Sequence, residues 1–333
     1  MGQRYGPAPS LAARRGSIHD VDVPDQTAGA GFVSLEPLEG GWSGETFVAE
    51  AGGERTVVRI YSGRRGPEAP AVDAAVLAYA AGVVPGVPPV LEVRRADPGR
   101  GVPGLLVTGF LPGERGDLVL PGLDAAEAAR AGEALGLVLV ALAGTALPRG
   151  GAFVDASLSI GAHPAPYDAD GMLELVEVLL AATGSRLRDL RADEQATLRT
   201  LAREAQDLLD EVPQHCLVHG DLNPKNLLLQ RGEGGPAVSG VLDWEFAHAG
   251  HPAADLGNLL RFERRPAFHD AVAATYAERR GLDVAHALDL ARAADLLALV
   301  ELASRAGSSP PADRALGRLR AVLATGDLHA TEA

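Results

Sequence analysis

The chain has 333 residues, 47% hydrophobic and 22% charged, a composition typical of a globular protein with room for two lobes. The formal net charge of −14 argues against a nucleic-acid-binding protein, because phosphate contacts need clustered positive charge. The single cysteine, Cys216, excludes an intrachain disulfide.

The acidic excess is concentrated in the second part of the chain. Residues 1–110 contain 10 basic and 12 acidic residues, whereas residues 111–333 contain 20 and 32. This distribution favours a cationic partner that docks on the C-terminal part, since opposite charges attract over the whole surface. An acidic surface that serves only to keep the protein in solution is the alternative.

Targeting signals are not apparent in the sequence. The first 25 residues are polar and lack the apolar segment of a secretory signal, and the longest apolar runs, 134–147 and 296–303, are too short to span a bilayer. We therefore expect a cytoplasmic protein with no membrane partner. The oligomeric state is left open.

The first 111 residues predict a flexible extension followed by a small antiparallel sheet. Residues 1–30 form the extension, and residues 31–111 form an N-terminal lobe. Short runs rich in β-branched and aromatic residues, separated by glycine-rich turns, indicate strands. These strands are expected at 32–38, 46–51, 55–61, 88–95 and 105–111, with one helix at 71–81 inserted after the third.

Residues 112–333 predict a mainly helical lobe. Pro112 and Gly113 interrupt the chain, and Asp124 is a suitable N-cap for a long apolar helix that extends to about residue 147. Further helical patterns occur at 170–183, 192–211, 252–262, 266–280, 284–306 and 311–324, with three strands among them at 216–218, 227–230 and 237–242.

Two segments near the middle of this lobe carry polar groups at the ends of apolar strands. The first is the His-Gly-Asp-x-x-x-x-Asn sequence of residues 219–226, a polar loop between two apolar strands. The second is Asp-Trp-Glu at 243–245, which directly follows the strand at 237–242. A loop held between buried strands is a rigid support for functional side chains.

This set of side chains matches the requirements of phosphoryl transfer. One carboxylate must orient and deprotonate the attacking hydroxyl, while an amide oxygen and a second carboxylate hold Mg²⁺ against the phosphates. Magnesium prefers oxygen ligands and keeps several waters, so few protein ligands suffice.

The two motifs together resemble those of the aminoglycoside phosphotransferase family, relatives of the protein kinases. The resemblance implies an α+β, two-lobed protein-kinase-like fold and a small-molecule kinase that uses ATP or GTP with Mg²⁺. It implies that Asp221 is the catalytic base, that Asn226 and Asp243 bind Mg²⁺, and that His219 holds the loop. The continuation at 250–258 is also similar, and there Asp255 would support the catalytic loop.

The same resemblance implies which residues of the N-terminal lobe bind the nucleotide. The glycine-rich turn between the first two strands, with Gly40, Gly41, Ser43 and Gly44, would cover the phosphates, since glycine lets the backbone approach them closely. Kinases place a lysine on the third strand, but Lys225 is the only lysine in this chain, so Arg59 takes that position.

The remaining nucleotide contacts concern the next helix, the hinge and the catalytic loop. We expect Arg59 to pair with Asp73, with Glu68 as the alternative acid. Adenine or guanine would bond to backbone groups at Gly109 and Leu111, and Lys225 would reach the γ-phosphate.

The acceptor is expected to be a small cationic molecule, with an aminoglycoside-like antibiotic first and a metabolite such as choline, homoserine or a sugar amine second. Carboxylates on helices around 255–301 would bind it. Two other classes compete with a kinase. One is a metallohydrolase that uses the histidines and aspartates at 215–251, although no zinc-like ligand spacing occurs there. The other is a non-catalytic nucleotide-binding protein with a kinase fold.

Overall fold

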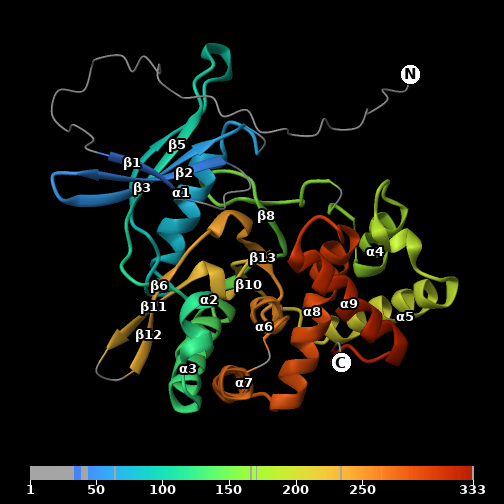
Figure 1. Cartoon of the computed structure of the whole chain (residues 1–333). Coiled ribbons are helices and arrows are strands. Elements are labelled where there is room, and N and C mark those ends of the chain that lie inside the picture. Colours follow the sequence, from blue (N-terminus) through green and yellow to red (C-terminus); the bar gives the residue numbers. More distant parts are fainter. Residues whose placement is uncertain are drawn as a thin grey trace.

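The structure is a computed structural model that describes residues 34–38, 44–63, 65–165, 167–169, 171–232, 235–263 and 265–331. A five-stranded antiparallel sheet with one helix forms an N-terminal lobe, and a larger, mainly helical C-terminal lobe lies beside it (Figure 1). This arrangement confirms the predicted α+β architecture of a small sheet lobe and a helical lobe. The predicted extension, residues 1–30, lies outside the described residues.

The sheet of the N-terminal lobe has strands with the alternation expected of a half-buried surface. In β5 the odd-numbered side chains are half-buried and Gly104, Leu106 and Thr108 are buried, because one face of the strand packs against α1. The strand order is β1 (Ser34–Leu38), β2 (Gly44–Ala51), β3 (Glu54–Tyr61), β5 (Gly104–Gly109) and β4 (Val90–Arg94), and α1 (Ala69–Ala80) is inserted after β3 as predicted.

The helices of the C-terminal lobe begin and end at residues whose chemistry explains their bounds. Asp124 and Glu127 form a capping box at the start of α3, and Asp283 and Ser309 cap α8 and α9. Gly281 and Gly326 end α7 and α9 in the left-handed conformation. The helices are α2 (Gly116–Val119), α3 (Ala125–Ala143), α4 (Met172–Ala181), α5 (Ala192–Asp210), α6 (Ala254–Leu260), α7 (Pro266–Arg280), α8 (Val284–Ser304) and α9 (Pro310–Thr325).

Two small sheets lie at the centre of this lobe. The predicted strands at 216–218, 227–230 and 237–242 are present, as β10 (His215–Val218), β11 (Leu227–Gly232) and β12 (Gly235–Val241). The long helix predicted to residue 147 instead ends at Ala143, because the chain turns at Gly144 and enters a strand. Strands of two or three residues, which have too little periodicity to be predicted, complete the sheets: β6 (Glu114–Arg115), β7 (Ala146–Leu147), β8 (Gly151–Phe153), β9 (Ile160–Gly161) and β13 (His248–Gly250).

Short 3-10 turns connect these elements. One of them, η4 (Pro224–Asn226) before β11, carries the predicted site residues Lys225 and Asn226, and another, η5 (Trp244–Phe246), directly follows Asp243. The others are η1 (Pro98–Arg100), η2 (Leu120–Gly122) and η3 (Arg186–Asp189).

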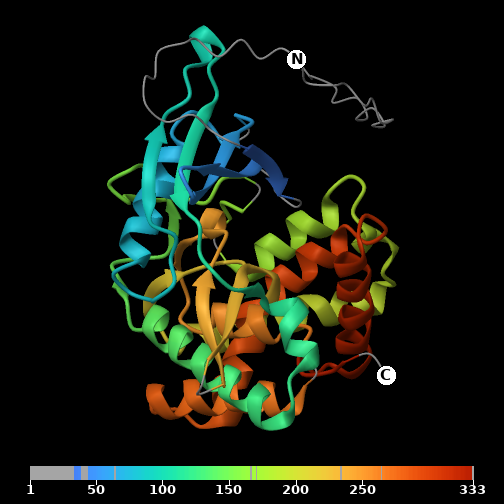
Figure 2. The same ribbon diagram turned by 60° about the vertical axis from the view of Figure 1, so that its left-hand side comes forward.

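The hydrophobic core has two parts that meet along α8. One part runs from α1 through α3 and β10–β12 to α6 and α7, so it joins the two lobes, and the other fills the space among α4, α5, α8 and α9. In Figure 2 the sheet lies above the helices, with α1 directed down toward the central strands. A backbone bond from the Val241 N–H to the Gly86 carbonyl, 2.8 Å, also joins the lobes. Within the described part of the chain, no helix is both long and apolar enough to cross a bilayer.

Candidate active site

The loop between β10 and β11 holds Asp221 by its own neighbours. The Asp221 Oδ1 accepts a hydrogen bond from the Asn223 amide at 2.8 Å, and its Oδ2 accepts one from the Asn226 amide at 2.8 Å. Burial raises the pKa of Asp221, and these two hydrogen bonds oppose that shift by favouring the carboxylate. The result is an oriented carboxylate on a short loop between two buried strands.

His219 anchors the same loop to the end of β12. Its Nε2–H donates to the Leu242 carbonyl at 2.8 Å, and its Nδ1 accepts from the Asp221 backbone N–H at 3.2 Å. These two bonds require the neutral Nε2–H tautomer, and burial lowers the pKa of His219 to about 4, which keeps the ring neutral. His219 therefore supports the loop, as the resemblance implied.

Asp255, on the first turn of α6, fixes the backbone that precedes Asp221. Its carboxylate accepts the His219 N–H at 2.7 Å and the Gly220 N–H at 3.0 Å, and the side chain is buried. Gly220 has φ +82°, and a Cβ there would lie 2.5 Å from the Phe246 carbonyl oxygen. Only glycine fits this turn, so the chain path into Asp221 is tightly determined.

Asp243 lies next to this loop because β12 pairs with β11. The Leu242 N–H donates to the Asn226 carbonyl at 2.8 Å, which ties the residue after β12 to the last residue of the catalytic loop. Asp243 has φ +63°, an uncommon conformation for a residue with a side chain. Burial, reinforced by Glu245, raises the pKa of Asp243 to about 6, and Arg59 opposes the shift.

The oxygen atoms of Asp243 and Asn226 are suited to a hard divalent cation. The Asn226 Nδ2 donates to both the backbone and the carboxylate of Asp221, so its Oδ1 is directed away from that carboxylate. An amide oxygen beside a half-exposed carboxylate fits Mg²⁺, which needs few protein ligands. Across the described residues, no group of three or more His, Cys, Asp or Glu side chains is arranged to hold a metal.

Arg59 reaches from the N-terminal lobe to these carboxylates. Its two terminal nitrogens lie 3.2 Å from Asp243 Oδ1 and 2.6 Å from Glu245 Oε2. The predicted pair between Arg59 and Asp73 is wrong, because Arg59 is directed toward the C-terminal lobe. The approach of η5 to β3 offers two carboxylates to the guanidinium, which no local pattern in the sequence could indicate.

Asp73 pairs with Arg65 of the β3–α1 loop. Both carboxylate oxygens accept from Arg65, at 2.7 and 2.8 Å, and the Tyr61 hydroxyl donates to Oδ2 at 2.7 Å. The alternative acid, Glu68, pairs with Arg95 at 3.1 Å on the surface. Both carboxylate oxygens of Asp73 therefore accept hydrogen bonds from residues close to it in sequence.

The other residues predicted to bind the nucleotide are only partly described. Gly40, Gly41 and Ser43 lie outside the described residues, whereas Gly44 begins β2 opposite Tyr61 of β3.

The hinge residues lie at the end of β5. The Gly109 N–H donates to the Pro89 carbonyl at 2.8 Å, and the Phe110 N–H donates to the Arg55 carbonyl at 3.3 Å. Leu111 follows directly after them. Lys225 is exposed on η4, next to Asn226.

Carboxylates in the segment proposed to bind a cationic acceptor are paired with arginines. Glu263 binds Arg265, and Glu301 binds Arg305 at 2.9 Å. Asp295 accepts two bonds from the Arg261 Nε, at 3.0 and 2.9 Å, and this pair is buried. These three carboxylates are therefore neutralised by arginines, and two of them, Glu263 and Asp295, are buried.

Three residues of the site were not predicted as site residues, namely Glu245, Arg65 and Tyr61. Glu245 was visible as the third residue of the Asp-Trp-Glu motif, but its position beneath Arg59 requires the packing of the two lobes. Tyr61 lies on the same face of β3 as Arg59, two residues away, which is the spacing that indicates a shared face. Arg65 has no periodic signal because it lies in a loop.

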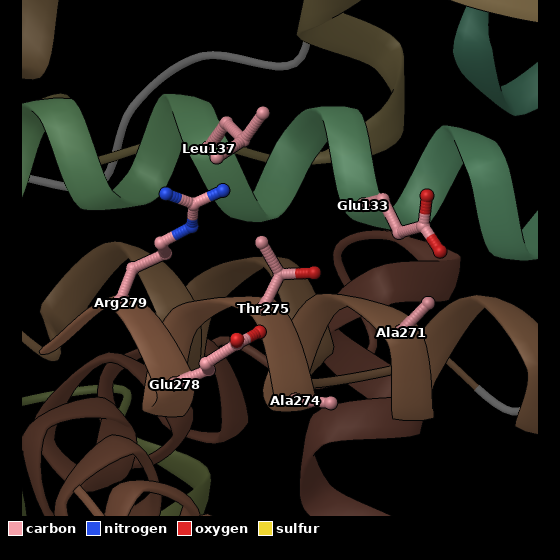
Figure 3. Close-up of a pocket in the computed structure, with 7 residues that line it drawn as sticks. All are labelled: Glu133, Leu137, Ala271, Ala274, Thr275, Glu278 and Arg279. Carbon is pink, nitrogen blue, oxygen red and sulfur yellow. The ribbon is translucent and has the colours of Figure 1, made fainter. Parts of the chain in front are cut away.

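A separate pocket of about 340 Å³ lies between α3 and α7. Figure 3 shows Glu133 and Leu137 on α3 and Thr275, Glu278 and Arg279 on α7, with the Arg279 side chain extending toward α3. None of the predicted site residues lines this pocket, so it is distinct from the catalytic loop.

The family model described as the phosphotransferase enzyme family matches residues 34–296. Over 53 residues the chain is 42% identical to the viomycin phosphotransferase of Streptomyces vinaceus. This matched segment is 15% of this chain and only 18% of the length of that relative.

Solved structures of similar fold cover nearly the whole chain. The GDP complex of aminoglycoside 2'-phosphotransferase-IIIa has a TM-score of 0.66 at 16% identity and covers 89% of this chain and 94% of that one. A thermostable mutant of aminoglycoside phosphotransferase APH(4)-Ia, in complex with AMP-PNP and hygromycin B, has a TM-score of 0.62 at 19% identity. The match covers 89% of this chain and 95% of that one.

Proposed function

Because the chain belongs to the phosphotransferase enzyme family, we propose that it transfers the γ-phosphoryl group of ATP or GTP to a hydroxyl group of a small cationic, antibiotic-like molecule. The observation that carries the proposal is the meeting of Asp221, Asn226 and Asp243 at the junction of β10, β11 and β12, opposite Arg59 of the N-terminal lobe. A loop with a base and two oxygen ligands, facing a cation on a second lobe, is the arrangement that phosphoryl transfer needs.

Each residue has a role that its surroundings support. Asp221, held by two asparagine amides, would orient the acceptor hydroxyl and take its proton. Asn226 and Asp243 would hold Mg²⁺, which supplies charge neutralisation at the phosphates when bound. Arg59 would bind the phosphates, since its planar guanidinium matches phosphate oxygens.

The proposal includes the division of the chain. Residues 31–111 would form the nucleotide-binding lobe, with Gly40, Gly41, Ser43 and Gly44 over the phosphates and Gly109 and Leu111 at the base. Residues 112–333 would carry the catalytic loop and the acceptor site, with Lys225 beside the γ-phosphate. Asp73 would act on this site through Arg65.

The acceptor class is inferred from charge and from the relatives. The net charge of −14 is concentrated after residue 110, which favours a cationic acceptor. The similar proteins include a viomycin phosphotransferase and a structure with kanamycin bound, and both support an antibiotic as acceptor.

A nucleotide-consumption screen tests this function. The purified protein is incubated with Mg²⁺ and ATP or GTP in the presence of viomycin, hygromycin B, kanamycin, macrolides and amino-alcohol metabolites, and products are identified by mass spectrometry. We expect one of the antibiotics to gain a single phosphoryl group, with the signal abolished by a chelator and restored by added Mg²⁺. Phosphorylation of a metabolite with no antibiotic modified would contradict the acceptor class, and no transfer in the full panel would contradict the proposed function.

A further inference from the structure

Five charged side chains form a continuous series of ion pairs between the two lobes. The series runs from Asp73 on α1 to Arg65, from Arg65 to Glu245 on η5, from Glu245 to Arg59 on β3, and from Arg59 to Asp243. We call these five residues the interlobe relay. It begins on the helix of the N-terminal lobe and ends at the carboxylate proposed to bind Mg²⁺.

Glu245 is the centre of the relay. One of its oxygens, Oε2, lies 2.6 Å from the Arg59 Nη2 and 3.7 Å from the Arg65 Nη1. Its side chain is 3% exposed, so the attraction to both guanidinium groups is weakly screened by water. A single buried carboxylate therefore fixes the positions of two like-charged groups.

Arg65 is held from the other side by Asp73. The contact is bidentate, at 2.7 and 2.8 Å, and the Tyr61 hydroxyl occupies the Asp73 Oδ2 as well. A planar guanidinium in a bidentate contact has little freedom to rotate. Tyr61 and Arg59 share a face of β3, with the Arg59 guanidinium carbon 5.5 Å from the centre of the Tyr61 ring, so the same strand supports both Arg59 and the hydroxyl that holds Asp73.

We propose that Arg65 is a positioning residue for the phosphate side of the site: braced by Asp73, it holds Glu245, and Glu245 directs Arg59 toward Asp243 and the triphosphate. The inference rests on the proposed function, because it assigns to Arg65 an indirect effect on nucleotide binding. Arg65 binds Asp73, the acidic residue of α1, and Arg59 is directed to the C-terminal lobe instead. Arg65 itself need not contact the nucleotide.

Binding of Mg²⁺ with AMP-PNP or GMP-PNP, measured by titration calorimetry without any acceptor, tests the relay. Arg65→Gln and Glu245→Gln should each weaken binding of the nucleotide about tenfold, and the double variant should be no weaker than Glu245→Gln alone, because both act through one path. Arg65→Lys keeps a cation beside Glu245 and should lose less affinity than Arg65→Gln. Arg95→Gln removes a surface pair to Glu68 in the same region and should leave binding unchanged.

The outcomes separate the inference from the proposed function. If the wild-type protein binds neither nucleotide analogue, the proposed function fails. If the wild type binds and Arg65→Gln binds equally well, only the inference fails. Losses that add in the double variant would also overturn it, since they would indicate that Arg65 contacts the nucleotide directly. A changed Mg²⁺ requirement in Glu245→Gln but not in Arg65→Gln would overturn it as well, in favour of Glu245 as a metal ligand.

Discussion

The catalytic loop and the interlobe relay contain similar charged groups but are assembled in different ways. Asp221 is held by Asn223 and Asn226, two and five residues away, whereas Arg59 meets Asp243, which is 184 residues away. The loop is therefore built within one lobe, on strands that fix its ends. The relay exists only when the two lobes lie in one relative position. We expect substitutions in the loop to affect the chemical step and substitutions in the relay to affect nucleotide binding.

The largest effect separates the two regions at the chemical step. Asp221→Asn should lower kcat by about 10²–10⁴-fold, because the side chain retains its size but no longer accepts the proton of the acceptor hydroxyl. Nucleotide affinity should change little, since the relay is intact. Steady-state kinetics with the acceptor found in the screen provide kcat, and a comparable loss of nucleotide affinity would contradict the division between the regions.

The second effect concerns the support of the loop. Asp255→Ala should lower the free energy of unfolding by about 3 kcal/mol, because the buried N–H groups of His219 and Gly220 lose their acceptor. Urea unfolding measures the change.

Asp283 provides the matched control for this variant. It also accepts two backbone N–H groups, those of Ala285 and His286, but on the surface at the start of α8. Asp283→Ala should cost about 1 kcal/mol and leave activity unchanged. Equal losses of unfolding free energy in the two variants would show that the burial of Asp255 does not add to its contribution to stability.

The third effect depends on pH and acts on the C-terminal lobe. Burial lowers the pKa of His219 and of His248 to about 4, below the value near 6.5 of an unfolded chain. The unfolded state therefore takes up protons first as the pH falls, so the stability from each neutral histidine is complete above about pH 6.5 and is lost toward pH 4. Fully buried His219 contributes about 3 kcal/mol over this range, and His248, which is only half-buried and better screened by water, contributes less.

Urea unfolding between pH 7 and pH 4.5 measures this loss. His248→Gln should reduce the slope of stability against pH, because one of the histidines with a lowered pKa no longer titrates. An unchanged slope would show that His248 takes no part in the acid sensitivity.

The smallest effect concerns the relay. Arg59→Gln should weaken binding of the Mg²⁺–nucleotide about tenfold, or about 1.4 kcal/mol, because a cation opposite Asp243 is lost. The kcat at saturating nucleotide should fall much less than in Asp221→Asn. Binding of AMP-PNP and the kinetics of both variants check this, and a loss confined to kcat would contradict a phosphate-binding role.

Much of the fold followed from local patterns. The cap at Asp124 and the helical patterns of α3, α5, α7, α8 and α9 predicted those helices to within a few residues, except at the end of α3. Strands of two or three residues, such as β6 and β9, were missed, because they are defined by their partners and not by their own sequence.

The candidate site was predictable to the extent that it is local. The motifs between apolar strands, through the family that they resemble, indicated Asp221, Asn226 and Asp243. In the structure Asn226 bonds to Asp221, and its carbonyl accepts the N–H of Leu242, the residue before Asp243. The pairing of Arg59 was predicted wrongly, because the choice among Asp73, Asp243 and Glu245 depends on distances between the lobes. Their roles in catalysis stay predictions.

The sequence by itself determined the catalytic loop, since strand ends and hydrogen bonds over two to five residues leave its side chains few arrangements. Only the tertiary structure decided how the cations are shared. The strength of an ion pair depends on the distance between the charges and on their burial. Arg65 therefore pairs with Asp73, and Arg59 pairs with the carboxylates of the other lobe.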